Sequence, residues 1–432
     1  MSKTIRTFVG ALAPLTFLAC SSYTPQPLEP TDLLADLRTQ QSPTTANGNT
    51  LSPNQATSAA LQYNPELLAV RESVGIADSM LKQAGAWPDI NLSWGAIDWL
   101  VGRTSDDVLT GFSAGVPLFR PDERDALIAN AAASRELVRV QLLEAEWRLT
   151  RRVQHQYVAL AAAQEQLRLA QFAKQLAAET VDFLQQGVDA GAATRFDLEM
   201  ALLQDGEAQF ALLASQNAEQ GARLHFNALI GTQPSATFTL TPLGSLLEAW
   251  PNPQVQDAVE LTDLALNNRP EVLASQAQYQ RAEAALQLES ARQWPGLELG
   301  TGIAVQLPIF SGFNKRAVAT ARLQRDQAAL ELKAAIAQVR NESWMVFQQA
   351  QSHALEWQSF DQQVSPRLEA SLEMTRQAQQ LGSLSYMEVL FAQRQLNDAR
   401  ATSIEVLAAH LLAQSDLAWF LGSNATLSET VQ

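Results

Sequence analysis

The segment Asp122–Gln186 most constrains the fold, because it contains neither glycine nor proline. Either residue costs about 1 to 3 kcal/mol inside a helix, so a stretch this long without them predicts one continuous helix. Gly187 and Gly191 then follow, only four positions apart, and indicate that the helix ends there. A helix of this length is not stable alone, so it must pack laterally in a bundle or an oligomeric barrel.

The chain is a tandem repeat. Three landmarks recur with the same separation: GAATRFDL at 191 and GSLSYMEV at 382, VPLF at 116 and LPIF at 307, and ALIG at 228 and WFLG at 419. Two earlier landmarks also recur, NPELLA at 64 as RPEVLA at 269, and WP at 87 and 294. An unchanged spacing suits long helices, because one inserted residue rotates everything after it by about 100°.

Segment lengths predict the architecture of each repeat. From Pro117 to Gly191 a helix would extend roughly 110 Å, the return segment to ALIG roughly 60 Å, and Ser52–Trp87 roughly 50 Å. One long helix therefore runs down, and two shorter helices stacked end to end return the same distance. The second half closes in the same way, with Leu261–Trp294 as its ascending piece. Pro366 is expected to kink the second long helix without ending it.

Ile90–Phe119 is predicted to be a β-hairpin. Bulky and small residues alternate along Val108–Val116, which is the period of a strand. Strands of about 10 to 12 residues are long enough to cross a membrane, where Trp94, Trp99 and Phe112 could form an aromatic girdle. A soluble hairpin is the alternative interpretation.

The second hairpin is anomalous. Only GLELGTGIAVQL separates Pro295 from Pro308. Two spanning strands of about 9 to 11 residues each do not fit in that segment.

The N-terminus resembles a secretory signal. Met1–Ala19 has a basic start followed by an apolar run that is too short to span a membrane as a helix. FLAC resembles the lipobox of bacterial lipoproteins, which would make Cys20 the acylated residue, although Phe17 departs from the usual leucine. An ordinary signal peptide with an incidental buried cysteine is the alternative. Cys20 is the chain's only cysteine, so no internal disulfide can form.

Charge and composition exclude several function classes. The net charge of −15 disfavours nucleic acid as a partner and is compatible with a conduit for cations. None of the four histidines has metal-ligand spacing with another; they are His155, His225, His353 and His410. We find no phosphate-binding loop and no nucleophile with a matching base. The sequence therefore predicts no enzyme, no cofactor and no metal site.

The two predicted reversals have a complete structural explanation. Gly191 and Gly382 allow the left-handed backbone that a tight reversal needs. A hydroxyl residue and an acid three positions later form a capping box in each repeat. These capping residues are Thr194 with Asp197 and Ser385 with Glu388.

Taken together, these motifs resemble the TolC-type outer-membrane efflux proteins. The first motifs are NPELLA and RPEVLA, each followed by a helix and then by WP. PLF and PIFSG open the two long helices. GxxTxxDL and GxxSxxEVLxAQ lie at the two reversals. The resemblance covers roughly Leu51 to Gly422 and implies a mainly α fold with a small β part. Each chain would be a tandem-repeat protomer of a trimeric α-helical barrel, whose hairpins join a trimeric outer-membrane β-barrel.

The resemblance also implies the partners. They are two further copies of the chain, a periplasmic adaptor protein, an inner-membrane transporter of the RND or ABC type, and outer-membrane lipid, with Cys20 as the lipid anchor. The protein would lie in the outer membrane of a Gram-negative bacterium and extend into the periplasm.

The resemblance further implies site residues at the reversals, or tips. Glu388 lies at a family position for an acidic pore constriction, whereas Phe391 stands where many members carry a second acid, so the usual double acidic ring is in doubt. Asp197 is the matching candidate in repeat one. The residues expected to dock the adaptor are Gly191, Thr194, Gly382 and Ser385. A solvated helix face is the alternative interpretation of Glu388, Phe391 and Asp197.

The predicted division of the chain follows from these landmarks. It comprises a signal peptide (1–19), a lipidated tether (20–50), repeat one (51–231), an equatorial connector (232–260), repeat two (261–422) and a tail (423–432). Within repeat one we expect a hairpin (90–119), a long helix (121–187) and a tip (187–197); within repeat two, a short hairpin (296–310), a long helix (312–381) and a tip (382–388). Two functions remain: a passive exit duct of a tripartite exporter, or a periplasmic helical scaffold lipoprotein that no longer spans the membrane.

Overall fold

The computed structural model describes residues 23–39, 50–96, 110–250, 253, 255–300, 303–380 and 386–421. The chain divides into two compact units, Met1–Ser42 and Pro43–Gln432. The described part of the first unit contains the helix α2 (Pro30–Thr39). All other described elements belong to the second unit.

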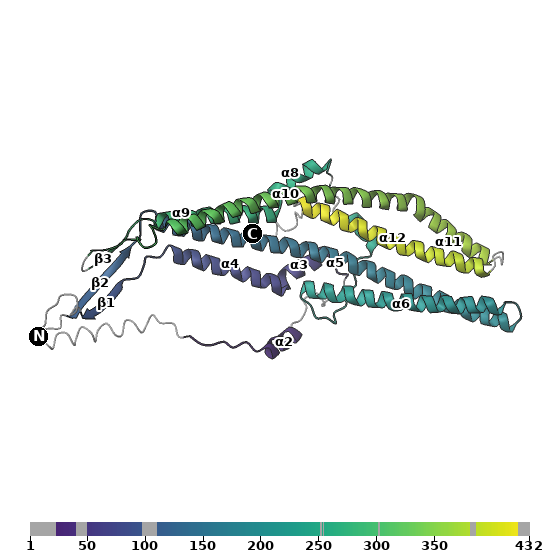
Figure 1. The fold of residues 1–432 in the computed structure, drawn as a ribbon. Coiled ribbons are helices and arrows are strands. Elements are labelled where there is room, and N and C mark those ends of the chain that lie inside the picture. Colours follow the sequence, from purple (N-terminus) through teal and green to yellow (C-terminus); the bar gives the residue numbers. More distant parts are fainter. Residues whose placement is uncertain are drawn as a thin grey trace. The chain divides into compact units, whose positions relative to one another are not determined.

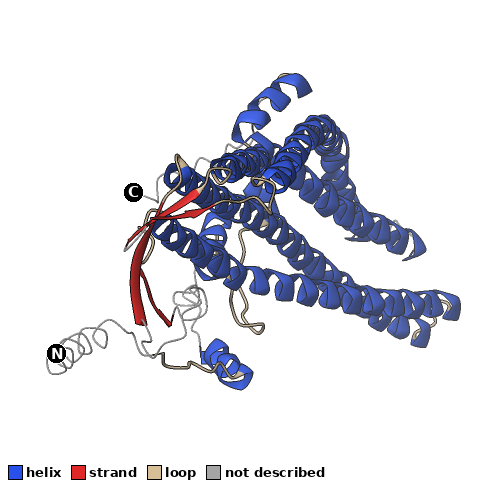
Figure 2. Cartoon of the chain, turned by 60° about the vertical axis from the view of Figure 1, so that its left-hand side comes forward, coloured by secondary structure: helices blue, strands red, loops and turns tan. Residues whose placement is uncertain are grey.

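The second unit consists of long helices and one small sheet (Figures 1 and 2). Its first repeat contains α3 (Pro53–Tyr63), α4 (Pro65–Ala84), β1 (Asn91–Ala96), β2 (Thr110–Leu118), α5 (Glu123–Asp189) and α6 (Arg195–Ile230). Then follow α7 (Leu243–Ala249), α8 (Ala258–Asn268), α9 (Pro270–Ala291), β3 (Gly296–Gly300), β4 (Ile303–Gln306), α10 (Lys315–Ser359), α11 (Ser365–Gln380) and α12 (Tyr386–Leu421). The predicted class, mainly α with a small β part, is confirmed.

Helix α5 organises the second unit. Its 67 residues extend about 100 Å. Near the sheet α5 packs against α4 and α9, in its middle it packs against α12, and toward its other end it packs against α6 (Figure 1). The two shorter helices of each repeat therefore run beside the long helices.

The main apolar core lies where α3, α6, α7 and α12 meet the middle of α5. Its largest fully buried side chains include Tyr157 and Phe226, whose rings pack edge to face. The Tyr157 hydroxyl donates to the Leu51 carbonyl at 2.6 Å and accepts from the Thr241 N–H at 3.0 Å. The connector between the repeats is thus held on α5 by one buried side chain.

The reversal after α5 is a Schellman turn. Gly191 has φ +74°, and the Ala192 N–H bonds to the Gly187 carbonyl at 2.7 Å while the Gly191 N–H bonds to Val188. The two glycines therefore have different roles. Gly191 provides the left-handed residue, and a Cβ on Gly187 would lie 3.0 Å from the Cβ of Ala193.

The predicted capping box begins α6. The Thr194 hydroxyl accepts from the Asp197 N–H at 3.2 Å, and Asp197 Oδ2 accepts from the Thr194 N–H at 3.1 Å. The structural explanation of Thr194 and Asp197 is therefore confirmed.

Both long helices begin later than predicted, because residues with positive φ precede them. Asp122 has φ 60°, so α5 begins at Glu123 and not at 121. In repeat two Gly312, Phe313 and Asn314 have φ 63°, 56° and 58°, so α10 begins at Lys315 and not at 312. A right-handed helix cannot include such residues.

The second long helix continues past Pro366. A π-helical turn, Phe360–Val364, separates α10 from α11, and the Ser365 N–H bonds to the Phe360 carbonyl. Figure 1 shows the helix bending there. The prediction that Pro366 kinks the helix without ending it is confirmed. The π turn lies just before Pro366, which has no backbone N–H to donate to the preceding turn.

The four strands form one antiparallel sheet in the order β1-β2-β3-β4. β1 pairs with β2 as predicted for the first hairpin, and β2 pairs with β3, so the sheet joins the two repeats. β3 has five residues and β4 has four. The second hairpin is therefore as short as its sequence indicates.

Helix α12 contains the one described segment, Phe391–Leu421, that is long and apolar enough to cross a membrane as a helix. Half of its most apolar window is buried, and α12 packs against α5, α8 and α10. Its hydrophobicity is thus explained by packing inside the bundle.

The end of α6 meets the start of α4 at a tight junction. Gly231 has φ +70°, and a Cβ there would lie 2.5 Å from the Tyr63 carbonyl oxygen. Asn64 caps α4 by accepting from the Leu67 N–H at 3.0 Å, and its amide donates to the Leu229 carbonyl at 3.0 Å. Two stacked helices are therefore joined by backbone contact.

We predict that Gly231→Ala destabilises the protein by roughly 2 kcal/mol or more, because it adds a left-handed penalty and a backbone collision. Chemical denaturation in detergent measures the change. Gly221→Ala is the matched control, since Gly221 lies inside α6 with open space around it and should gain about 0.5 to 1 kcal/mol. Equal effects of the two substitutions would contradict the proposed junction.

Candidate functional site

The structure places the predicted residues of the first tip in one short turn. Gly191 and Thr194 lie between α5 and α6, and Asp197 lies in the first turn of α6, at the end of α5 farthest from the sheet (Figure 1). The side chain of Asp197 is held by Thr194, because the Thr194 hydroxyl also donates to its Oδ2 at 2.6 Å. If Asp197 also faces the pore, its carboxylate has two roles, since it already caps α6.

The second tip is described only in part. Gly382 and Ser385 lie outside the described residues, as does Cys20. Glu388 and Phe391 lie in the first turns of α12, and both are exposed. Figure 1 shows this end of α12 at the same end of the second unit as the first tip.

Two charged contacts lie near the tips. Lys174 of α5 bonds to Asp205 of α6 at 2.5 Å, and Arg394 of α12 lies 3.6 Å from Glu207 of α6. The Arg394–Glu207 pair is largely exposed, so it contributes at most about 1 kcal/mol. It nonetheless links the return helices of the two repeats within two turns of Phe391.

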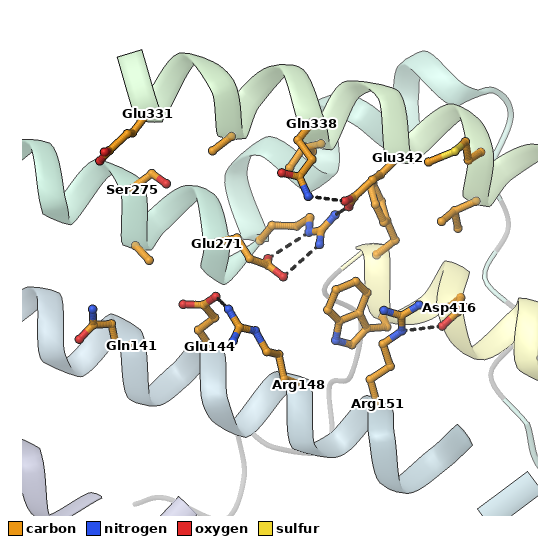
Figure 3. A pocket seen from close by; sticks show the side chains of 18 of the residues that line it. Gln141, Glu144, Arg148, Arg151, Glu271, Ser275, Glu331, Gln338, Glu342 and Asp416 are labelled. Atoms are coloured by element: carbon orange, nitrogen blue, oxygen red, sulfur yellow. Dashed lines mark hydrogen bonds and ion pairs between the residues drawn. The ribbon is translucent and has the colours of Figure 1, made fainter. Parts of the chain in front are cut away.

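A polar cavity of about 900 Å³ lies among α5, α9, α10 and α12 (Figure 3). We call this region the waist, because there α9 begins where α12 ends. Its charged lining residues include Arg148, Arg151, Arg269, Glu331, Glu342 and Asp416. The sequence did not indicate a site at the waist, although two of its repeated motifs, RPEVLA and WFLG, meet here.

Arg269 holds the waist together. Its side chain is only 5% exposed and is paired with Glu271 at 3.0 Å and Glu342 at 2.7 Å. The guanidinium carbon also lies 4.6 Å from the Trp419 ring and 4.4 Å from the Phe420 ring. These contacts compensate for burying the charge.

Two carboxylates of the waist, Asp416 and Glu342, have lowered pKa values. Burial alone would raise the pKa of Asp416, but hydrogen bonds from His155 and Arg151 outweigh it and hold the pKa below its usual range. Burial likewise opposes the lowered pKa of Glu342, which results from hydrogen bonds with Gln338 and Arg269. The waist is thus a charged network that neutral pH stabilises.

His410 is a buried base on the other side of α12. Its ring is 6% exposed and stacks on Trp357, with centroids 6.4 Å apart. Its Nδ1 has no hydrogen-bond partner among the described residues. Burial lowers the pKa of His410, and the nearby His353, which contacts Glu356, lowers it further.

No group of three or more histidine, cysteine or acidic residues is arranged to hold a metal ion in the part of the chain that the structure describes. Asp416, Glu271 and Glu342 of the waist are already paired with arginine or histidine side chains. The arrangement can bind and position charge, but no nucleophile with an adjacent base is among the waist residues described above.

The sheet has two unlike faces where its side chains are described. Residues opposite one another in an antiparallel pair share a face, so Val116 and Leu118 lie with Leu299 and Leu297. The same face carries Ile303 and Val305 of β4, both exposed. Pro117, Glu298, Ala304 and Gln306 lie on the other face.

Exposed apolar side chains also surround the junction of sheet and helices. Phe310 is 99% exposed. Others at this junction are Trp87, Ile90, Trp294 and Ile309. Rings of aromatic and apolar residues of this kind flank the spanning strands of membrane barrels.

A long helix with a partly apolar sheet at one end and a tight reversal at the other is the arrangement expected of an outer-membrane-factor protomer. Comparison with known proteins supports this class. Residues 56–232 match the family model described as "Outer membrane efflux protein". The predicted resemblance to the outer-membrane efflux proteins is confirmed by this match.

Individual relatives agree. The cobalt-zinc-cadmium resistance protein CzcC of Cupriavidus metallidurans is 26% identical over 388 residues, which cover 86% of this chain and 90% of CzcC. Crystal structures of CusC match with a TM-score of 0.69 and 18% identity over 94% of this chain and 99% of CusC. The outer membrane protein VceC of Vibrio cholerae matches with a TM-score of 0.68 and 16% identity over 86% and 96% of the two chains.

We predict that Arg269→Met destabilises the protein by roughly 2 to 4 kcal/mol, because Glu271 and Glu342 lose their buried partner while staying partly solvated. The measurement is denaturant unfolding at neutral pH. Arg152→Met is the control, since its pair with Glu66 is exposed at 3.6 Å and contributes at most about 1 kcal/mol. Similar losses in both variants would rule out a special role for Arg269.

The lowered pKa of His410 predicts a loss of stability in mild acid. Below about pH 6.5 the unfolded chain binds a proton that the folded chain does not, so stability falls by up to about 1.4 kcal/mol per pH unit until the folded pKa is reached. Unfolding measured from pH 7.5 to 5 in wild type and His410→Leu tests this. The variant should have a shallower slope than wild type, and equal slopes would contradict the predicted contribution of His410.

Proposed function

We propose that the protein is the outer-membrane channel subunit of a tripartite efflux system. The observation that carries this proposal is the sheet at one end of the long helices, whose described apolar face is exposed and uncovered. An apolar sheet face of this kind is stable against lipid acyl chains and costly in water. The family match and the likeness to CusC and VceC support the same function.

The proposed channel is a homotrimer. Exposed apolar residues repeat every seven positions on α6, at Phe196, Leu203 and Phe210. A second exposed stripe runs along α10, with Leu323, Leu330 and Trp344 on one helical face. Stripes of this spacing are buried by neighbouring helices, so these surfaces fit lateral packing against other protomers.

The tips are the proposed contact with the rest of the exporter. We assign Gly191, Thr194, Gly382 and Ser385 to docking of a periplasmic adaptor, which would couple the channel to an inner-membrane transporter of the RND or ABC type. The proposed constriction consists of Glu388 with Phe391 behind it, and Asp197 in repeat one. Three copies of Glu388 would form one acidic ring, which lowers the barrier for cations.

Cargo and anchoring follow as further parts of this proposal. The name of CzcC refers to resistance to cobalt, zinc and cadmium, and the net charge of −15 favours positively charged cargo. We therefore propose divalent metal cations as the cargo. Cys20 is the proposed lipid attachment site, and the outer membrane of a Gram-negative bacterium the proposed location.

The shortness of β3 and β4 favours a second candidate function. Strands of five and four residues are shorter than the roughly 9 to 11 that span a bilayer. A periplasmic scaffold lipoprotein that no longer crosses the membrane would fit this feature. The exposed apolar sheet face favours the channel.

Single-channel recording of the purified, lipidated protein in a planar bilayer tests the proposed function. We expect small cation-selective openings in wild type and larger ones in Glu388→Ala, because the ring of carboxylates at the second tip is removed. A salt gradient across the bilayer gives the ion selectivity.

A wild-type protein that shows no current could still be a channel, because a folded, membrane-bound protein with a sealed tip conducts no ions. The Asp197→Ala, Glu388→Ala double variant addresses that case by loosening both tips. If this variant conducts no ions, the channel proposal is wrong and the scaffold function replaces it.

A further inference from the structure

We propose that Glu298 forms a second carboxylate ring, on the inner wall of the β-barrel at its helix-side end, and that this ring favours positively charged solutes. The proposal rests on the proposed channel function, since three copies of the chain complete the ring. It concerns a residue far from the tips, at the other end of α5.

The register of the sheet places Glu298 on the face away from lipid. Its neighbours in β3, Leu297 and Leu299, are both exposed and share the apolar face with Val305. Glu298 pairs with Pro117 on one side and with Ala304 on the other. A barrel wall with an apolar face toward lipid must turn the opposite face, and with it Glu298, to the interior.

The strand beside Glu298 is adapted to its side chain. Gly115 of β2 is buried, and a Cβ built on it would collide with Oε1, Cδ and Cγ of Glu298. The carboxylate therefore lies across the backbone of β2, in space that only glycine leaves open. A larger residue at position 115 would therefore displace the Glu298 side chain from this place.

The negative charge of Glu298 is not neutralised within the described part of the protomer. Glu298 lines a hollow of about 370 Å³ together with Arg120, Glu123 and Gln306. Arg120 is already bonded to Glu123 at 3.0 Å and to the Trp294 carbonyl at 2.9 Å. No basic group lies within ion-pair distance of Glu298 among the described residues, so the hollow keeps one excess carboxylate.

The place of Glu298 in the chain indicates where along the channel the ring would lie. Glu298 is the third residue of β3, which begins five residues after α9 ends. The ring would therefore lie where the helical tunnel opens into the barrel. A cation that has passed the tips would meet a second attractive site, and an anion a second barrier.

Cysteine accessibility tests the placement. Glu298→Cys, Leu297→Cys and Leu299→Cys are each reconstituted in phosphatidylcholine vesicles and exposed to a water-soluble, membrane-impermeant methanethiosulfonate. The protein without an added cysteine reports the background from Cys20. We expect modification at 298 and protection at 297 and 299 until detergent is added.

Each other pattern has a distinct meaning. Modification at 297 and 299 with protection at 298 would show that the sheet faces the opposite way, which overturns this inference and leaves the channel intact. Protection of all three overturns the inference as well. Equal modification of all three would show that the sheet is outside the bilayer, which overturns the channel function itself.

The charge of the ring is tested with a reporter that does not depend on an open tip. Ala304→Cys lies opposite Glu298, and its reaction rates with a cationic and an anionic methanethiosulfonate are compared. We expect the ratio of cationic to anionic rates to fall about fivefold when Glu298→Gln is added, given a unit charge about 5 Å away at physiological salt. Glu298→Asp should keep the higher ratio, and Gln306→Glu, on the same face, should raise it. An unchanged ratio in Glu298→Gln would refute the proposed ring.

Discussion

Lateral packing of one very long helix is the constraint on which the rest of the structure depends. A helix of 67 residues has little stability in isolation, so α5 needs neighbours along its whole length. No single return helix is long enough to cover it. Stacked pairs do so instead, and for this reason repeat one contains a break between α6 and α4, and repeat two a break between α12 and α9 at the waist.

The two junctions between stacked helices, α6 with α4 and α12 with α9, are held by different kinds of contact. In repeat one Asn64 and Gly231 allow backbone contact between α6 and α4, so the junction is small and tight. In repeat two Arg269 occupies the position of Asn64, and Trp419 and Phe420 occupy positions in the ALIG-like motif. The junction there is wide, charged and aromatic. The repeat symmetry of the sequence therefore does not extend to the contacts at the two junctions.

Negative charge is distributed unevenly along the proposed conduit. The waist carboxylates are matched by arginine and histidine, as Asp416 and Glu342 show, so they stabilise structure and contribute little field. Glu298 at the sheet has no such partner in the described protomer. A carboxylate without an ion-pair partner acts more strongly on passing ions than one that is neutralised by a neighbour.

The amino-acid sequence alone determined the local features: the uninterrupted helix, the glycine reversal after α5, the Thr194–Asp197 capping box and the short second hairpin, because each depends on residues near one another in the chain. Tertiary structure alone decided which distant residues meet. It paired β2 with β3 and buried His410 against Trp357. It also surrounded Arg269 with Glu342 and Trp419 and placed Glu298 over Gly115. These contacts join residues far apart in the chain, and local propensity and periodicity carry no information about them.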